Sequence, residues 1–230
     1  MHLSWGKIRK AQLRLEKGGN VKKLILSFCV ASLLGVAGIA DALPFQNGSF
    51  EDPGAGSGAT TYFAGNTTIT GWTVESGSIA YLGAPWQAAE GKSSIDLNGF
   101  GAGSLSQKFD TVAGTMYEVI FAMAGNPLGG DLIKDLGVSV ADFSKDFTFD
   151  TSGKTITDMG WTNFSFTFLA TDLLTTLTFT SLENNAYGPA LDNVRVNLAN
   201  GGGNPVPEPA SMLMLGIGLT GLAFFGRKKF

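Results

Sequence analysis

Residues 163–168 read Asn-Phe-Ser-Phe-Thr-Phe, a strict alternation of polar and aromatic side chains. Because successive side chains of a β-strand point to opposite faces, the three phenylalanines share one face and the polar residues share the other. Burial of this row should contribute several kcal/mol, at about 2 to 3 kcal/mol per ring before chain entropy is counted. The stretch therefore predicts a strand with one face in a hydrophobic core.

The same period of two recurs on both sides of this stretch. Alternating apolar rows are found at residues 117–123, 136–140, 177–179 and 194–198. Shorter candidate strands lie at residues 72–74, 79–82, 93–97, 105–109 and 147–149. Glycine-rich segments at 54–58, 99–103 and 201–203 are typical of loops or a linker. Short strands at this spacing predict an all-β fold, an antiparallel jelly-roll β-sandwich over residues 43–198.

The predicted domain is acidic and lacks two reactive residue types. Ten of the sixteen Lys and Arg residues lie outside residues 43–206, so this part of the chain has a net charge near −10. Such a charge repels phosphate backbones, and we expect no nucleic acid as a partner. The only cysteine, Cys29, and the only histidine, His2, lie upstream. The domain therefore cannot form a disulfide, a Cys/His zinc site, a Ser-His-Asp triad or a Cys-His pair.

The N-terminal segment has the pattern of an export signal at residues 21–42. Lys22-Lys23 precede an apolar stretch, and Ala40 and Ala42 supply a small-x-small site for signal peptidase. We expect cleavage after Ala42. Residues 1–20 are interpreted as a possible start-site extension, with translation beginning at Val21; expression that persists after the Met1 codon is destroyed would test this.

The C-terminal segment combines three features in a fixed order. A Gly-rich linker at 199–206 precedes Pro207-Glu208-Pro209, an apolar run at 210–225, and a basic cluster at 227–229. As a transmembrane helix the apolar run would cover about 24 Å, slightly less than the hydrocarbon core of a bilayer, and the basic end should remain cytoplasmic. An ordinary tail anchor is the alternative interpretation.

This order of features resembles the PEP-CTERM sorting signal of Gram-negative bacteria. The resemblance implies that the chain is held briefly in the inner membrane and handed to exosortase, a membrane protease. Delivery to the cell surface or the extracellular matrix would follow.

The domain itself carries an ordered set of short motifs. They are Asn47-Gly48-Ser49-Phe50-Glu51, Gly71-Trp72, Trp86-Gln87, Ser94-Ile95-Asp96-Leu97-Asn98-Gly99, Gly125-Asn126-Pro127, Met159-Gly160-Trp161 and Gly188-Pro189-Ala190-Leu191-Asp192-Asn193-Val194. This set resembles the bacterial choice-of-anchor C family and is similar to a plant cell-wall family of the same design. The resemblance implies a galactose-binding-like β-sandwich carried by surface proteins with differing anchors. A fold does not by itself establish a function.

Glu51 and Asp192 are the candidate metal ligands. In related jelly-roll carbohydrate modules the first and last strands lie close together, and an acidic residue from each end holds a structural Ca²⁺ with backbone carbonyls. Calcium binds six to eight oxygens, so carboxylates joined by turn carbonyls suit it. The alternative is that both carboxylates accept hydrogen bonds from backbone N–H groups of turns.

Candidate carbohydrate-binding residues are aromatic and amide side chains near turns. Trp86, Tyr81 and Tyr187 lie beside glycines and prolines, where aromatic rings are often exposed and could stack on sugar C–H bonds. Asn98 and Asn126, and also Gln107, could bind hydroxyl groups. The alternative is that the rings close the ends of the sandwich core, which the strand contexts of Trp72 and Trp161 favour for those two residues.

Together these features predict an exported, non-catalytic surface or exopolysaccharide-matrix protein that binds carbohydrate. One alternative is a structural or self-associating adhesion module without a sugar site. The other is a carboxylate-based polysaccharide hydrolase, for which the available residues are Glu75, Glu90, Asp96 and Asp110.

Overall fold

The computed structural model describes residues 43–199. The predicted start-site extension, the export signal with Ala40 and Ala42, and the segment at 207–230 with its transmembrane helix lie outside the described residues. Of the predicted linker, only Ala199 is described. The described part of the chain contains no helix that is long and apolar enough to cross a membrane.

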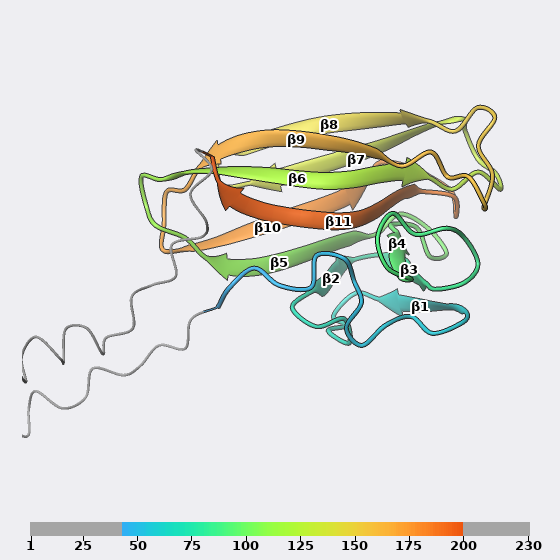
Figure 1. Ribbon diagram of the computed structural model, residues 1–230, viewed down its shortest axis with the longest axis horizontal. Helices are drawn as coiled ribbons and strands as arrows, with labels where there is room; N and C mark the ends of the chain where they lie inside the picture. The colour runs from blue at the N-terminus through green and yellow to red at the C-terminus, as the bar shows by residue number, and fades with distance from the viewer. Residues whose placement is uncertain (1–42, 200–230) are drawn as a thin grey trace, which may run out of the picture. The chain divides into compact units, whose positions relative to one another are not determined.

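Within residues 43–199, antiparallel strands form two sheets that pack face to face (Figure 1). The six-stranded sheet has the order β1 (Ala59–Phe63), β3 (Ser78–Leu82), β4 (Ser94–Asp96), β11 (Pro189–Leu198), β6 (Met116–Gly125) and β9 (Thr162–Leu169). The five-stranded sheet has the order β2 (Thr73–Ser76), β5 (Ser104–Asp110), β10 (Leu174–Ser181), β7 (Ile133–Val140) and β8 (Phe143–Asp150). The predicted all-β antiparallel sandwich is therefore confirmed. β1 is not among the predicted strands, because its residues are exposed or half-buried and carry no apolar alternation.

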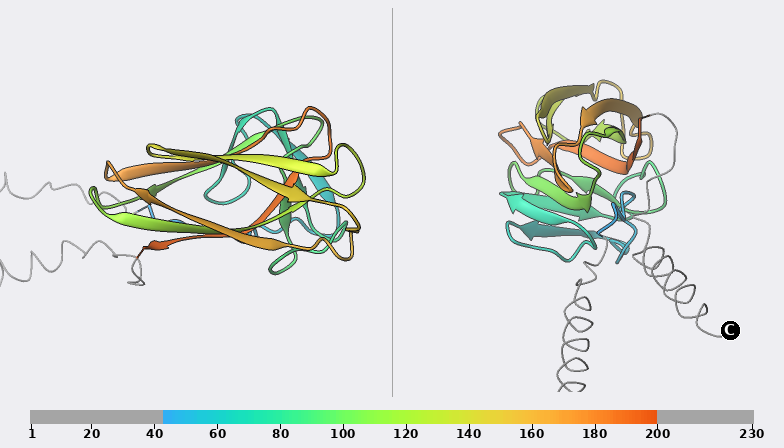
Figure 2. Two further views of the ribbon diagram at one scale, coloured as in Figure 1. Left: turned by 90° about the horizontal axis from the view of Figure 1, so that it is seen from above. Right: turned by 90° about the vertical axis from the view of Figure 1, so that its left-hand side faces the viewer.

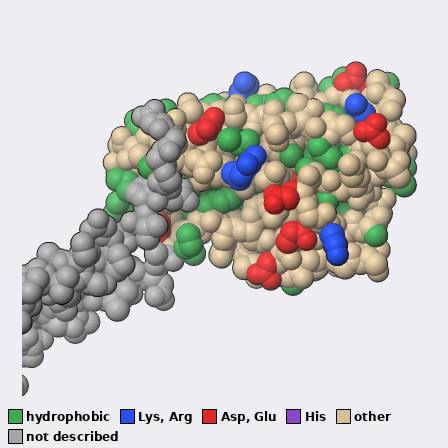
Figure 3. All heavy atoms as spheres, viewed as in Figure 1, with side chains coloured by type: hydrophobic (Ala, Val, Ile, Leu, Met, Phe, Trp, Pro, Cys, Tyr) green, Lys and Arg blue, Asp and Glu red, His purple; other side chains and the backbone are tan. Residues whose placement is uncertain are grey.

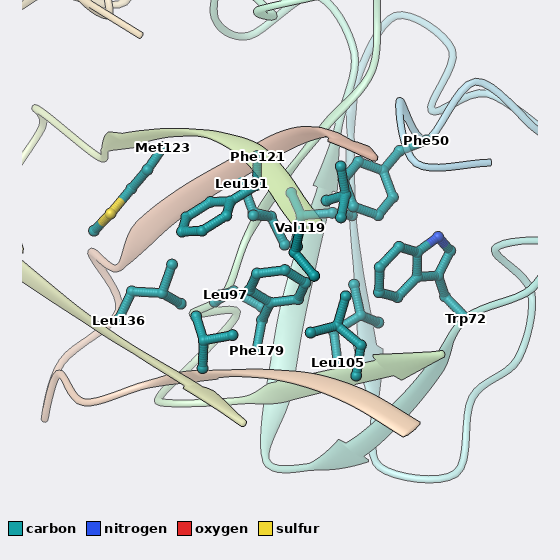
Figure 4. Close-up of a cluster of buried hydrophobic side chains, with 14 of the residues drawn as sticks. Phe50, Trp72, Leu97, Leu105, Val119, Phe121, Met123, Leu136, Phe179 and Leu191 are labelled. Carbon is teal, nitrogen blue, oxygen red and sulfur yellow. The ribbon is translucent and has the colours of Figure 1, made fainter. Parts of the chain in front are cut away.

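The aromatic row of β9 packs as the alternation predicts. Phe166 and Phe168 are buried, and Phe164 is half-buried. The Phe166 ring stacks on Phe143 of the opposite sheet, with 4.2 Å between ring centroids. Figure 4 shows side chains of both sheets meeting in the core, where Phe121 of β6 contacts Phe179 of β10 with 5.4 Å between centroids.

The sandwich has two distinct ends. At one end Leu198 pairs with Tyr117, and the backbone N–H of Leu43 donates to Asp110 at the end of β5. At the other end Pro189 pairs with Gly125. Since β6 has ten residues, the ends are about 30 Å apart at roughly 3.3 Å per residue. Both ends of the described chain therefore leave the sandwich on the same side (Figures 1 and 2), and loops 126–132 and 182–188 lie at the opposite end, which we call the distal end.

Candidate functional site

The first and last motifs of the domain lie against each other. The backbone N–H of Val194 donates to the carbonyl of Gly48 at 2.8 Å. A Cβ atom at Gly48 would lie 1.8 Å from the Val194 carbonyl oxygen, so only glycine fits this approach. The contact falls at the register shift of β11 between Asp192 and Arg195. The expected proximity of the first and last segments of the domain's sequence is therefore confirmed.

Glu51 and Asp192 both bind the loop that joins β3 to β4. Oδ2 of Asp192 accepts hydrogen bonds from the backbone N–H groups of Ala89 and Glu90 at 2.8 and 2.9 Å. Oε1 of Glu51 accepts hydrogen bonds from the N–H groups of Lys92 and Ser93, both at 2.7 Å. The geometry of the turn-binding alternative is thus present, and the two carboxylates clamp one loop from both sequence ends of the domain.

The electrostatics of this loop clamp favour a cation, whereas the ligand count is low. The pKa of Asp192 is raised to about 7, mainly by burial and in smaller part by the negative charge of Glu51, against hydrogen bonds from Glu90, Asn193 and Ala89 that lower it. Within residues 43–199 no group of three or more His, Cys, Asp or Glu side chains could hold a metal ion. The charge of the site therefore fits Ca²⁺, but most oxygen ligands would have to be backbone carbonyls.

The structure places Tyr81 and Trp86 in the core, so of the two interpretations the core alternative holds, and the assignment of these two rings to carbohydrate stacking is corrected. Tyr81 is 1% exposed; its hydroxyl donates to the carbonyl of Phe50 and accepts from the N–H of Gly54. Trp86 is 5% exposed and donates through Nε1 to Ser94 Oγ at 2.6 Å. Both rings find hydrogen-bond partners inside, which is the usual condition for burying such side chains. Trp86 also contributes to the wall of a groove of about 530 Å³.

The predicted amide ligands are also buried. Gln107 is 2% exposed, and its side chain exchanges two hydrogen bonds with the backbone of Gln46. Asn98 and Asn126 are 1% and 8% exposed, respectively. The structure therefore corrects the expectation that these three amides are free to bind sugar hydroxyls, because the protein itself uses them.

Asn98 and Asn126 meet at the distal end around the buried carboxylate of Asp96. Oδ2 of Asp96 accepts from Asn126 Nδ2 at 2.8 Å. Oδ1 of Asp96 accepts from the backbone N–H groups of Asn98 and Gly188 at 2.9 and 3.1 Å. Asn98 Nδ2 donates to the carbonyl of Asn185, while Asn98 Oδ1 is buried without a hydrogen-bond partner. We call these residues, with Lys134, the Asp96 network.

Lys134 is a fully buried lysine in the Asp96 network. Its Nζ donates to the carbonyl of Gly129 at 2.8 Å. Burial lowers the pKa of Lys134, while the carboxylates of Glu183, Asp96 and Asp131 raise it. Burial raises the pKa of Asp96 to about 7, and Lys134 is among the groups that oppose this rise. The sequence contained a signal that we missed: Lys134 lies at period two with Leu136, Val138 and Val140, so its side chain had to point inward.

Tyr187 is the predicted aromatic residue that remains accessible. It is 38% exposed and lies in the loop held by Asn98. A Cβ atom at Gly129 would lie 2.7 Å from the Tyr187 ring, so the ring packs directly on the glycine backbone. Leu128 and Leu132, which lie in the loop that contains Gly129, are 68% and 61% exposed. The distal end thus presents an aromatic and aliphatic surface supported by the Asp96 network.

The structure does not bring the candidate hydrolase carboxylates together. Asp96 is buried at the distal end, whereas Asp110 lies at the other end beside Leu43. Glu75 accepts a hydrogen bond from Ser106 Oγ on the five-stranded sheet, and Glu90 belongs to the loop that Asp192 clamps. Figure 3 shows acidic and basic side chains scattered over the visible face.

Comparison with known sequences extends these findings. Residues 205–229 match the PEP-CTERM protein-sorting motif, which confirms the motif predicted at Pro207, Glu208 and Pro209. Halomucin of Haloquadratum walsbyi (strain DSM 16790 / HBSQ001) is 34% identical over 158 residues. This match covers 66% of the present chain but only 2% of halomucin.

Comparison with solved structures returns modules of related architecture at low similarity. TmCBM61, solved in complex with β-1,4-galactotriose, has a TM-score of 0.43 and 15% identity, covering 68% of this chain and 98% of that chain. The CBM35 of Paenibacillus barcinonensis has a TM-score of 0.41 and 18% identity, covering 61% and 99%. The resemblance to the choice-of-anchor C family stays a prediction. Residues 43–197 match the family described as "Protein of unknown function (DUF642)", and the chain therefore belongs to the DUF642 family.

Proposed function

We propose that this protein is exported, is sorted by exosortase to the cell surface or exopolysaccharide matrix, and binds polysaccharide there without catalysis. The PEP-CTERM motif at residues 205–229 supports the route, and it agrees with the export signal predicted at residues 21–42. Signal peptidase and the inner membrane are the transient partners of this route. The host would be a Gram-negative bacterium, in which such motifs are expected.

The observation that carries the binding proposal is the placement of Tyr187. Its ring lies over Gly129 and remains 38% exposed, at the end of the sandwich opposite to Leu43 and Ala199. A domain that is tethered through its C-terminal segment presents this end away from the tether. Sugar rings stack on such supported aromatic faces because their C–H groups face the negative π surface. Asn98 and Asn126 act in this proposal as supports of the loops that carry the ring.

The acidic charge of the domain narrows the ligand class. With a net charge near −10 between residues 43 and 206, the domain repels acidic polymers at long range. A neutral polysaccharide carries no such penalty. Neutral glycans, including the β-1,4-galactan type of which TmCBM61 binds a trisaccharide, are therefore the first ligands to test.

We also propose a structural Ca²⁺ at the loop clamp, held by Glu51 and Asp192 with backbone carbonyls of the loop between β3 and β4. The metal would supply positive charge to two neighbouring carboxylates, one of which is desolvated. It would bind the folded state alone and so stabilise the domain by mass action. The chain's own residues hold the loop in either case through the four backbone hydrogen bonds.

Binding of the purified chain to a panel of glycans, with and without Ca²⁺, tests the proposal. The full chain and residues 43–199, which contain both sheets and their shared core, are assayed side by side. We expect saturable binding to a neutral glycan and a loss of about tenfold in affinity for Tyr187→Ala, equivalent to about 1.4 kcal/mol. Leu173→Ala is the matched control, because Leu173 is 73% exposed but lies at the end of the sandwich opposite to Tyr187. It is three residues after Ala170, whose backbone pairs at that end.

Two results would contradict the proposal. Absence of saturable binding to every glycan, together with concentration-dependent assembly in sedimentation, would favour a self-associating matrix module. Release of reducing sugar from the host's own polysaccharide would favour a hydrolase.

A further inference from the structure

Two phenylalanines lie side by side on the surface, outside the core. Phe63 at the end of β1 is 57% exposed, and Phe100 in the turn between β4 and β5 is 76% exposed. Their rings are stacked, with 5.9 Å between centroids and 28° between planes. We propose that this aromatic pair is a second carbohydrate-binding site, which stacks on the pyranose rings of a neutral glycan; this inference rests on the proposed function.

The turn that carries Phe100 is held tightly against β3. Asn98 and Ala102 form an isolated β-bridge that closes the turn. The backbone N–H of Gly99 donates to the Ser78 carbonyl at 2.8 Å, and that of Phe100 donates to Ser78 Oγ at 2.9 Å. The Phe100 ring is therefore presented from a fixed backbone, which lowers the entropy lost when a ligand binds.

The glycine before Phe100 has a packing reason. A Cβ atom at Gly99 would lie 2.7 Å from Thr61 Cγ2 and 2.8 Å from Ser78 Oγ, so no larger residue fits against β1 and β3. At Gly101 a Cβ atom would meet nothing within 4 Å. The turn is thus packed on the protein side and open on the solvent side, and Phe100 lies on the open side.

The composition around the pair favours a neutral, hydroxyl-rich ligand. Residues 59–68 and 97–104 contain no Lys, Arg, Asp or Glu, whereas threonine, serine and asparagine are frequent in them. Without basic residues nearby, the pair lacks the groups that attract phosphate or an anionic membrane surface. Aromatic faces and uncharged hydrogen-bonding groups together match the alternating C–H and O–H surfaces of a hexose.

The size of the site also favours sugar over a folded protein partner. Stable protein interfaces bury about 800 Å² on each partner, far more than two partly exposed rings provide. Two stacked phenylalanine rings are comparable in extent to one or two sugar rings. The pair is therefore large enough for a glycan segment and small for a protein interface.

The test uses Phe100→Ala, the double variant Phe63→Ala/Phe100→Ala, and the ring-retaining Phe100→Trp. Binding to β-1,4-galactan, mannan and cellulose is compared with binding to polygalacturonate, alginate and phosphatidylglycerol vesicles. We expect about tenfold weaker binding to a neutral glycan for the alanine variants and retained binding for Phe100→Trp. Thermal unfolding should change little, since surface substitutions usually alter stability by less than about 0.5 kcal/mol.

The outcomes separate this inference from the proposed function. If the unmodified chain binds a neutral glycan and the alanine variants bind it equally well, the aromatic pair is not a binding site, although the proposed function stands. If the unmodified chain binds no glycan, both fail. Two other results would overturn the assignment to a neutral glycan. One is selective binding of the unmodified chain to the vesicles or the acidic polymers, with this binding lost in the alanine variants. The other is a dimer of the unmodified chain that the alanine variants do not form.

Discussion

Asp96 and Asp192 are two buried aspartates that both accept hydrogen bonds from the backbone but lie near side chains of opposite charge. Each accepts hydrogen bonds from backbone N–H groups, and burial raises the pKa of each to about 7. Lys134 lowers the pKa of Asp96, whereas Glu51 raises that of Asp192. The two sites therefore differ in the sign of the next charge.

This difference indicates at which site the protein itself supplies a positive charge near the buried aspartate. At the distal end a fully buried lysine supplies the positive charge, and the Asp96 network links β4, β7 and the loop before β11. At the loop clamp, formed by Glu51, Asp192 and the loop between β3 and β4, two carboxylates bind one loop, and the negative charge of Glu51 raises the pKa of Asp192. A cation from solution would give the loop clamp what Lys134 gives the Asp96 network.

Lys134→Met should have the largest effect, because it removes the cation from the Asp96 network. The carbonyl of Gly129 would lose its donor and the buried carboxylate of Asp96 would lose a nearby positive charge, so we expect a loss of about 3 kcal/mol. Thermal or urea unfolding measures this. Lys108→Met is the matched control, since Lys108 is exposed on β5 and should change stability by less than about 0.5 kcal/mol.

A double variant tests whether Lys134 acts through Asp96. Asp96→Asn combined with Lys134→Met should cost less than the sum of the two single changes, because the second removes a charge that the first has left unpaired. Strict additivity would show that Lys134 is stabilised by Gly129 and its packing alone, and the comparison between the two aspartates would lose its basis.

Asp192→Asn should have the next largest effect and should alter the response to Ca²⁺. The amide keeps one acceptor for the N–H groups of Ala89 and Glu90, so we expect a loss of about 1 to 3 kcal/mol. Calcium should raise the melting temperature of the unmodified chain and leave that of the variant unchanged. A melting temperature of the unmodified chain that is insensitive to both Ca²⁺ and chelator would remove the calcium proposal.

Much of the fold was predictable because one periodicity determines it. The alternation at residues 163–168 places Phe166 and Phe168 in the core, and the rows on β6, β7, β10 and β11 follow the same rule. β1 escaped prediction because an edge strand with exposed residues needs no apolar alternation. Periodicity also indicated that Lys134 points inward, but a charge at an inward position is normally taken as a break in the pattern.

The candidate site was less predictable, because exposure near turns depends on tertiary contacts. Tyr81 and Trp86 lie beside turns as Tyr187 does, yet their polar atoms find Phe50 and Ser94 inside the domain. Phe100 lies in a glycine-rich segment that was correctly predicted as a loop, but only the pairing of β1 with β3 brings Phe63 beside it. Contacts between residues far apart in sequence decided each of these cases.

The pH dependence of stability should sharpen the comparison with a moderate effect. Both aspartates have pKa values raised from 3.8 to about 7, so between these values the folded state binds more protons than the unfolded state. Stability should therefore be highest near or below pH 4 for these groups and fall as pH rises through 7, above which their contribution no longer changes. Melting temperatures measured from pH 5 to pH 8 in the presence of chelator test the sign.

Two variants assign the pH effect to its residues. Asp192→Asn should flatten the profile, because it removes one of the two groups. Asp150→Asn should not flatten it, since hydrogen bonds from Ser152 lower the pKa of Asp150 and its contribution has the opposite sign. A profile that rises with pH between 5 and 8 would show that burial does not control either aspartate.

Glu51→Gln should have the smallest effect on stability and the most specific one on metal binding. Glutamine keeps an acceptor for the N–H groups of Lys92 and Ser93 while it removes the charge that raises the pKa of Asp192. Without Ca²⁺ we expect a stability within about 0.5 kcal/mol of the unmodified chain and a pH profile shifted toward lower pH. With Ca²⁺ the gain in melting temperature should shrink, because a neutral oxygen binds the cation less strongly than a carboxylate. An undiminished gain would mean that Glu51 holds the loop through its hydrogen bonds alone and that any bound cation depends on Asp192 and the backbone. The charge of Glu51 would then not distinguish the site of Asp192 from that of Asp96.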